Sequence, residues 1–248
     1  GASDLALHNG FTHQYLSISK IYVLPLQSID FTCTKPSEEA SHVVILIGLR
    51  YRIQEALQQH PDARAVMLVE PSYVGGVSDV AAIAAVAHEH GIPLTVDAAW
   101  GAHLGFHPEL PPHAIQAGAD ILVTSVHKHI TGFTQSSMVL VQGDLINLER
   151  LEAAFEGLHT TSPSGAIFAS IDRARGLLQD RGEELLGNAI HIAGGARERL
   201  RQIPGLGVLG SEFARRSPGL LMQDPTKVIL TLSGTGADGQ VVADVLEQ

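Results

Sequence analysis

Short apolar runs alternate with amphipathic segments through the middle of the chain. Four of these runs have the length of buried strands: Ala65–Val69, Leu94–Val96, Asp120–Thr124 and Ser137–Val141. A helix is predicted from a cap at Ser78-Asp79 to His90, and a shorter helix is predicted to end at Ala117. Strands that alternate with helices at this spacing pair in parallel through crossover helices. The pattern therefore predicts an α/β fold of three layers, α/β/α, with a mostly parallel sheet.

The ends of the chain carry other patterns. Beyond the last of these strands, the spacing of apolar residues predicts three helices, one strand and the start of another helix: 144–156, 166–179, 183–202, 227–232 and from about Asp238. In the first sixty residues we predict a strand over Ile21–Leu24 and a helix over Arg52–Gln59, whereas Ser28–Ala40 is polar and has no period.

Composition narrows the class of protein. The chain has 248 residues, of which 45% are hydrophobic, so it can bury a core and is not a disordered chain. Its net charge of −10 argues against nucleic acid or an anionic membrane as a partner. The longest apolar run, Val43–Leu49, is too short to span a bilayer. A single cysteine, Cys33, and no visible secretion signal lead us to expect the cytoplasm.

Two ionisable residues stand where predicted strands end. Asp97 closes the second strand and Lys128 follows the third, so both belong to the sheet edge at which parallel α/β folds bind ligands. The two side chains can form a simple ion pair. They also match the needs of pyridoxal phosphate (PLP), which uses a lysine as its covalent anchor and a carboxylate at its ring nitrogen. Between packed layers the amine would be desolvated enough to be nucleophilic. Only four lysines exist, and Lys20, Lys35 and Lys227 stand in weaker contexts.

Several segments in order resemble one known family, the ornithine/lysine/arginine decarboxylases. The segments are PSYVGG, VDAAWGAHLGFHPELPPHAIQAGAD, TSVHKHITGFTQSSMVLV and HTTSPSGAIFASIDRAR, between Gln54 and Arg175, with a weaker echo, DPTKVILTLSGTGADG, from Asp224. The resemblance implies a PLP enzyme of the aspartate-aminotransferase fold (fold type I). It also implies decarboxylation of lysine, ornithine or arginine to a diamine or agmatine, a reaction of polyamine metabolism.

The resemblance also assigns roles near the cofactor ring. Lys128 corresponds to the lysine that forms the internal aldimine, and Asp97 to the aspartate that keeps the ring nitrogen protonated. Ala99 matches a small residue that packs against the ring. Lys128 or His127 would deliver the final proton to the product.

Further positions match the phosphate end and the mouth of the family's site. Ser125 and His127 correspond to a pair that contacts the cofactor phosphate. Trp100 is expected near the cofactor or the substrate entrance, with a core aromatic as the alternative. The loop Thr161-Ser162-Pro163 resembles a segment that reaches the active site of a neighbouring subunit, so that Ser162 would touch the cofactor and a homodimer or higher oligomer would be needed. An ordinary helix-capping loop is the alternative.

The chain also departs from the family pattern. Only Gly1–Asp4 faintly matches the glycine-rich phosphate loop, and His8 and His13 are out of register for the histidine that stacks on the ring. The stretch Ser28–Leu49 shows no resemblance, and we expect the C-terminal small domain to be absent because the sequence stops at Gln248. We therefore divide the chain into an atypical segment, 1–53, and a cofactor-binding core, 54–248. A non-catalytic, decarboxylase-like fragment or partner subunit is the main alternative function.

A metal-dependent hydrolase is the alternative from another class. Among 13 histidines, the pairs His88/His90 and His127/His129 have spacings that metal ligands use, and Asp97 could join them. The first pair suits the end of a helix, where it favours the helix dipole, and His103/His107 lies in a Gly/Pro-rich loop. We therefore expect PLP, a basic amino acid substrate and no metal.

Overall fold

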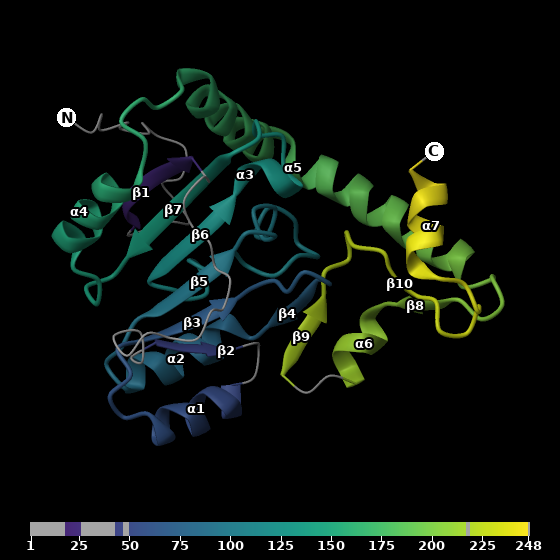
Figure 1. Cartoon of the computed structure of the whole chain (residues 1–248), viewed down its shortest axis with the longest axis horizontal. Coiled ribbons are helices and arrows are strands. Elements are labelled where there is room, and N and C mark those ends of the chain that lie inside the picture. The colour runs from purple at the N-terminus through teal and green to yellow at the C-terminus, as the bar shows by residue number, and fades with distance from the viewer. Residues whose placement is uncertain (1–17, 26–42, 47–49, 217–218, 248) are drawn as a thin grey trace.

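The structure is a computed structural model that describes residues 18–25, 43–46, 50–216 and 219–247 (Figure 1). The predictions made for Gly1–Asp4, His8, His13, Lys35 and Ser28–Ala40 lie outside these residues. The division of the chain at residue 53 stays a prediction.

A six-stranded sheet forms the centre of the molecule. Its strands are β1 (Ile18–Pro25), β2 (Val43–Leu46), β3 (Ala65–Val69), β5 (Leu94–Ala98), β6 (Ile121–Ser125) and β7 (Ser136–Gln142). They lie in the order β1-β7-β6-β5-β3-β2. The pairs β2/β3, β3/β5 and β5/β6 are parallel, whereas β7 pairs antiparallel with β6 and with β1. The predicted α/β class with a mostly parallel sheet is therefore confirmed.

Strand β7 runs antiparallel to β6 because the connection between the two strands is short. Between β6 and β7 the chain has only the four-residue helix α3 (Val126–His129) and the loop 130–135. A parallel crossover needs about a dozen residues or more, so β7 can only fold back against β6. The lysine that follows β6 is thereby held at the edge of the sheet.

One face of the sheet is covered by α1 (Arg50–Gln59) and α2 (Val80–Glu89). Along β5, Leu94, Val96 and Ala98 are buried against these helices, while Thr95 and Asp97 point to the opposite face and are half-buried. Helix α2 begins where predicted, because the Asp79 carboxylate accepts the N–H of Ala82 at 3.0 Å. The alternation along β5 thus places Asp97 on the face away from this core.

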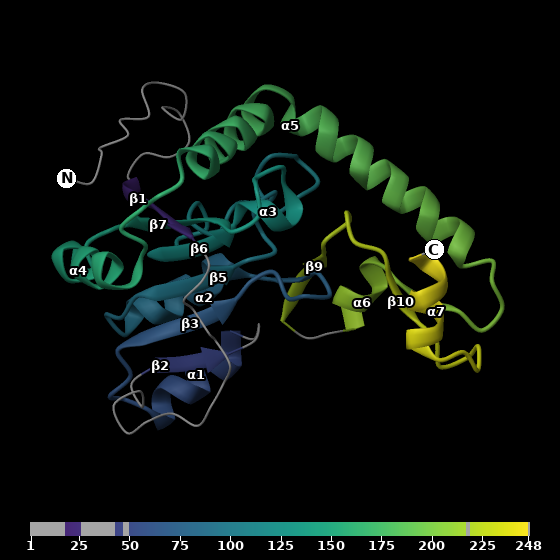
Figure 2. The same cartoon turned by 45° about the horizontal axis from the view of Figure 1, so that its top comes forward.

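The short helix predicted before Ala117 does not form. The N–H of Ala117 bonds to the carbonyl of His113 at 3.0 Å, which makes a single turn, and Gly118 then adopts a φ of 102°. The loop from Trp100 to Ala119 is therefore irregular and wraps over the end of the sheet (Figure 2).

After α4 (Leu148–Leu158) the chain enters one helix of 36 residues, α5 (Gly165–Leu200). We predicted two helices here, with a break near Gly182. The helix continues because Gly182 is buried against Phe106: a Cβ at this glycine would lie 3.4 Å from the Cβ of Phe106. Its buried face, which includes Leu178, Leu186 and Ile190, packs on the loop that contains Leu104 and Leu110.

The C-terminal part returns to the sheet edge after leaving α5. It contains β8 (Gly207–Leu209), α6 (Ser211–Arg216), β9 (Leu220–Gln223), β10 (Ile229–Thr231) and α7 (Gly239–Leu246). Strands β8 and β10 pair with each other, and β9 pairs antiparallel with β4 (Gly76–Ser78), just after β3 (Figures 1 and 2). Residues near 223 consequently lie beside residues near 75. Among the described helices, none is both long and apolar enough to cross a membrane.

Candidate active site

The carboxyl ends of three parallel strands meet at one edge. In register, Asp97 of β5 lies between Val69 of β3 and Val123 of β6. The hydroxyl of Thr124 donates to the carbonyl of Ala98 at 2.9 Å and ties β6 to β5 at this edge. Lys128 follows in α3, immediately beyond β6. The predicted convergence of Asp97 and Lys128 on one sheet edge therefore agrees with the topology.

Asp97 is half-buried, and its carboxylate has one hydrogen-bond partner among the described residues. Its Oδ1 accepts the N–H of Ala99 at 3.0 Å, which fixes the carboxylate and the half-buried Ala99 relative to each other. The described residues form no ion pair between Asp97 and Lys128, so the simple ion-pair alternative is wrong for this part of the chain. The second carboxylate oxygen is left for another donor.

Lys128 is exposed, contrary to the expectation that packed layers would desolvate it. Helix α3 has only four residues and stands at the rim of the sheet, so little of this chain covers the amine. Its Nζ lies 4.8 Å from the centroid of the Trp100 ring, within the range of a cation–π contact.

Trp100 lies at the mouth of the site rather than in the core. It is half-buried and meets Tyr73 edge-on, with ring centroids 5.0 Å apart, and His129 edge-on at 5.5 Å. Tyr73 is 71% exposed. Of the two alternatives for Trp100, the position near the entrance fits the structure.

The pair expected at the cofactor phosphate flanks Lys128. Ser125 is buried at the N-cap of α3, and its side chain makes no capping hydrogen bond. Nδ1 of His127 donates to the carbonyl of Ser136 at 2.9 Å, which assigns the proton of the neutral ring to Nδ1 and leaves Nε2 as an acceptor. The hydroxyl of Ser136 is buried without a partner among the described residues.

Ser162 lies elsewhere in the described structure. It is exposed in the loop between α4 and α5, and its N–H donates to the hydroxyl of Thr160 at 3.2 Å. The described residues provide no contact between Ser162 and the sheet edge. Its reach to a neighbouring subunit stays a prediction.

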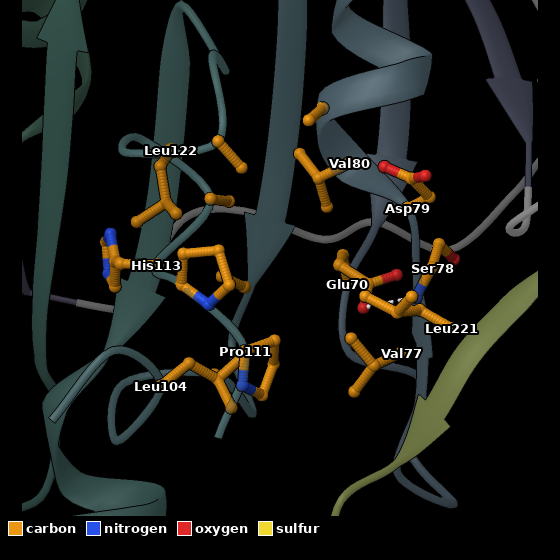
Figure 3. A pocket seen from close by; sticks show the side chains of 16 residues that line it. Glu70, Val77, Ser78, Asp79, Val80, Leu104, Pro111, His113, Leu122 and Leu221 are labelled. Atoms are coloured by element: carbon orange, nitrogen blue, oxygen red, sulfur yellow. Dashed lines mark hydrogen bonds between the residues drawn. The ribbon is translucent and has the colours of Figure 1, made fainter. Parts of the chain in front are cut away.

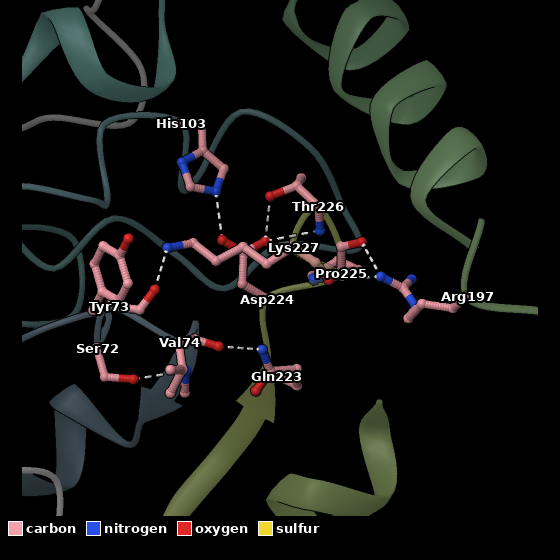
Figure 4. A network of polar contacts seen from close by, with 11 residues as sticks. Ser72, Tyr73, Val74, His103, Arg197, Gln223, Asp224, Pro225, Thr226 and Lys227 are labelled. Carbon is pink, nitrogen blue, oxygen red and sulfur yellow. Dashed lines mark hydrogen bonds and ion pairs between the residues drawn. The ribbon is translucent and has the colours of Figure 1, made fainter. Parts of the chain in front are cut away.

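The structure adds Lys227 to the site, although its sequence context suggested only a lysine at the start of a strand. Its Nζ lies 4.8 Å from the centroid of Trp100 and donates to the carbonyl of Tyr73 at 2.9 Å (Figure 4). Burial lowers the pKa of Lys227, and the negative charge of Asp224 opposes this effect. The signal that could have found it was the echo DPTK in the family resemblance.

A buried histidine–aspartate pair supports this corner. Nε2 of His103 lies 2.9 Å from Oδ2 of Asp224, with the two side chains 1% and 0% exposed. Oδ1 of Asp224 accepts the N–H of Thr226 at 2.9 Å and its hydroxyl at 2.7 Å. Burial would raise the pKa of Asp224, but the hydrogen bonds from His103 and Thr226 and the charge of His103 bring it below its ordinary value.

The histidines are grouped differently from the pairs weighed in the sequence. His88 bonds to Asp120 at 2.8 Å and His127 to a carbonyl, so neither pair forms a ligand set with Asp97. In the described chain, His103, His129 and Asp224 have ligand atoms within 4.8 Å of one another. Burial, together with the nearby charges of His103 and Lys227, lowers the pKa of His129 to about 4, so its ring is neutral at pH 7.

A separate cavity lies behind the site, with two buried titratable groups on opposite sides (Figure 3). Glu70 follows β3, and its Oε1 accepts the N–H of Ser78 at 2.9 Å. Burial raises the pKa of Glu70 to about 7 and lowers that of His113 to about 4. The cavity, of about 60 Å³, has room for one or two water molecules and is too small for an amino acid.

The residues at the sheet edge suit the cofactor that the resemblance implies. The amine of Lys128 has no ion pair in the described chain, the Asp97 carboxylate keeps one oxygen available, and Ala99 is small enough for a ring to approach. The buried hydroxyl of Ser136, next to His127, has no hydrogen-bond partner among the described residues and can bond to a polar ligand. The glycine-rich loop expected for the phosphate falls on residues outside those described.

Comparison with known proteins points to one family. The sequence model described as "Orn/Lys/Arg decarboxylase, major domain" matches residues 33–245. The match includes residues 33–49, so the expectation that Ser28–Leu49 shows no resemblance to the family is wrong for this part. An arginine decarboxylase of Bacillus subtilis (strain 168) is 38% identical over 195 residues, 79% of this chain and 40% of that protein. A second, from Bacillus cereus, is 36% identical over 219 residues, 86% of this chain and 47% of that protein.

Solved structures agree on the fold. The constitutive lysine decarboxylase of E. coli superposes with a TM-score of 0.60 at 18% identity, over 80% of this chain and 34% of that chain. A pyridoxamine-pyruvate aminotransferase of Mesorhizobium loti gives a TM-score of 0.55 at 17% identity, over 80% of this chain and 51% of that chain. The chain spans less than half the length of the two Bacillus arginine decarboxylases.

Proposed function

Because the chain belongs to the Orn/Lys/Arg decarboxylase family, we propose that it forms the cofactor-binding part of a PLP-dependent enzyme that decarboxylates a basic amino acid. Lysine, ornithine and arginine are the candidate substrates, and Lys128 is the proposed covalent anchor of the cofactor. The chain covers about two fifths of the length of the Bacillus subtilis arginine decarboxylase, so decarboxylation by this chain is part of what we propose.

The observation that carries the proposal is the shared sheet edge of Asp97 and Lys128. Both residues stand at the carboxyl ends of neighbouring parallel strands, and the register places β6 directly beside Asp97. This is the edge at which open α/β sheets bind ligands. An amine and a carboxylate without an ion pair between them are available there for a third group.

When bound, PLP supplies an electron sink that stabilises negative charge at the substrate's α carbon. Asp97 would support that role by accepting a hydrogen bond from the ring nitrogen, and the Ala99 N–H holds its Oδ1 in place. Ala99 leaves space for the ring. Trp100 lies beside the exposed Lys128 amine, with its ring centroid 4.8 Å from Nζ.

Proton transfer at the α carbon falls to Lys128 or His127. The His127 ring is oriented, because its Nδ1–H is committed to the carbonyl of Ser136. Its Nε2 is therefore the ring atom left to take up or deliver a proton. Ser125 also flanks the anchor, and its hydroxyl can donate to the dianionic phosphate. His127 can donate to it through Nε2 only when its ring is protonated.

The decisive experiment is a PLP titration of the purified chain. Absorbance reports attachment of the cofactor, borohydride fixes it, and peptide mass mapping identifies the labelled lysine. We expect the label on Lys128 and its loss in Lys128→Ala. Mapping is essential because Lys227 contacts the same indole, so a label on Lys227 would overturn the assignment of the anchor.

Release of CO₂ from arginine, lysine and ornithine then identifies the substrate. Lys128→Ala should release none, and persistent CO₂ release from this variant would refute the mechanism. Attachment of PLP without any CO₂ release would favour the non-catalytic alternative. Light scattering with and without PLP measures the oligomeric state, which we propose to be a homodimer or higher oligomer completed by the Ser162 loop.

A further inference from the structure

Two lysines that lie 99 positions apart in the sequence meet at one indole ring. Lys128 approaches Trp100 from α3, and Lys227 approaches it from the segment after β9, each with its Nζ 4.8 Å from the ring centroid. Neither amine has an ion pair among the described residues. The two positive charges repel each other, and neither is paired with a carboxylate among the described residues. An anion that binds between them would relieve this repulsion.

The only carboxylate near Lys227 in this network is already engaged. Both oxygens of Asp224 are used, Oδ2 by His103 and Oδ1 by the N–H and hydroxyl of Thr226. Asp224 is 0% exposed and does not turn toward solvent. It therefore influences Lys227 through its charge and takes none of the hydrogen bonds that the ammonium can donate.

The backbone that carries Lys227 is held firmly. Nη1 of Arg197, from α5, donates to the carbonyl of Pro225 at 2.9 Å and to that of Lys227 at 2.8 Å (Figure 4). The N–H of Lys227 donates to the carbonyl of Asp224 at 3.2 Å. These contacts aim the half-buried side chain at the mouth of the site and reduce the entropy lost when it binds a ligand.

An ammonium has three hydrogens to donate. The carbonyl of Tyr73 takes one from Lys227 at 2.9 Å, which orients the amine and leaves two for a ligand. A carboxylate accepts two such bonds and is the one anionic group of a basic amino acid. Under the proposed function the Lys128 amine is taken up by the cofactor, so Lys227 remains as the free cation at the ring.

We propose that Lys227 binds the α-carboxylate of the substrate at the Trp100 edge of the site. This proposal rests on the proposed function for the identity of the substrate. The oriented ammonium holds the carboxylate while the amino acid docks, and only hydrogen bonds and charge attraction are lost when neutral CO₂ departs. Lys227 accordingly contributes to substrate binding more than to the chemical step.

The test compares ligands that differ only at the carboxylate. L-arginine, its methyl ester and agmatine form one set, and L-lysine, its methyl ester and cadaverine form another. Binding is measured by calorimetry on the full chain with PLP fixed by borohydride, so that no turnover competes. We expect Lys227→Met to weaken binding of the acid about tenfold and to leave the ester and the amine within about twofold.

Two variants guard against a merely structural effect. Lys227→Arg keeps the charge and should retain the preference for the acid over its ester. Arg64→Met removes one exposed cation before β3, at the opposite edge of the sheet, and should change nothing. In turnover assays, Lys227→Met should raise KM for the amino acid about tenfold and change kcat much less.

The outcomes separate this proposal from the proposed function. Equal binding of acid and ester by the parent chain, or an acid preference that survives in Lys227→Met, overturns the role of Lys227 even if CO₂ is released. If PLP does not attach to Lys128, the proposed function fails, and the same titrations on the full chain without PLP decide whether Lys227 selects a carboxylate.

Discussion

Glu70 allows a quantitative prediction about stability and pH. Its side chain is 2% exposed, Oε1 accepts the N–H of Ser78, and Oε2 has no partner among the described residues. Burial raises its pKa from 4.5 to about 7. Between these two values the folded chain keeps the proton that the unfolded chain has lost. The free energy of unfolding therefore falls as pH rises through this window.

The size of the effect follows from the two pKa values. A separation of about 2.5 units at 1.36 kcal/mol per unit corresponds to about 3 kcal/mol. Glu70→Gln removes the ionisation and keeps the shape of the protonated acid, so its oxygen can still accept the N–H of Ser78. We expect the variant to lie within about 1 kcal/mol of the parent at pH 5 and to be about 3 kcal/mol more stable at pH 8.

The assay is urea unfolding of both chains from pH 5 to pH 9, followed by circular dichroism. Other groups that titrate, including His113, are common to both proteins and cancel in the difference. Glu109→Gln, which changes an exposed carboxylate in a loop, serves as the control and should show no such trend. A Glu70→Gln chain no more stable than the parent at pH 8 would refute the assignment of a buried, protonated carboxyl.

The remaining predictions concern the buried pair, the cavity and the long helix. Asp224→Ala should lower the free energy of unfolding by about 3–5 kcal/mol, because it leaves the buried His103 side chain, 1% exposed, without a partner. Asp224→Asn should lower it by only about 1 kcal/mol. Equal losses for the two variants in denaturant titrations would contradict this prediction. Burial lowers the pKa of His113 to about 4, so the parent chain loses stability as pH falls from 6.5 toward 4. His113→Leu should therefore gain about 3 kcal/mol of unfolding free energy relative to the parent over that range. A constant difference in unfolding free energy between pH 7 and pH 4 would refute this prediction. Gly176→Ala, where an added Cβ meets nothing within 4 Å, should stabilise α5 by about 0.5–1 kcal/mol, and a lower Tm in thermal melts would count against it.

Local sequence patterns were sufficient to predict most strands of the central sheet. The apolar runs that form β3, β5, β6 and β7 were recognisable because burial on a sheet selects short hydrophobic segments. The cap at Asp79 was visible because it depends on neighbouring residues alone. The position of Asp97 and Lys128 at one edge followed from the parallel order of the strands.

Contacts between segments that are distant in the sequence could not be predicted from these local patterns. The break predicted in α5 is absent because Phe106 packs against Gly182, a contact between residues 76 positions apart. The exposure of Lys128 reflects how little of this chain covers α3. The pKa of Glu70 depends on burial, which no local motif encodes.

The sequence by itself determined the α/β class, the family and the strand ends that carry Asp97 and Lys128, because these depend on period and short motifs. Only the tertiary structure brought Lys227 to Trp100 and Asp224 to His103. The return of the chain after α5 and the pairing of β9 with β4 create both contacts. Side chains more than a hundred positions apart meet only when the whole core has packed, so the second lysine of the site could not be recognised from its own surroundings in the sequence.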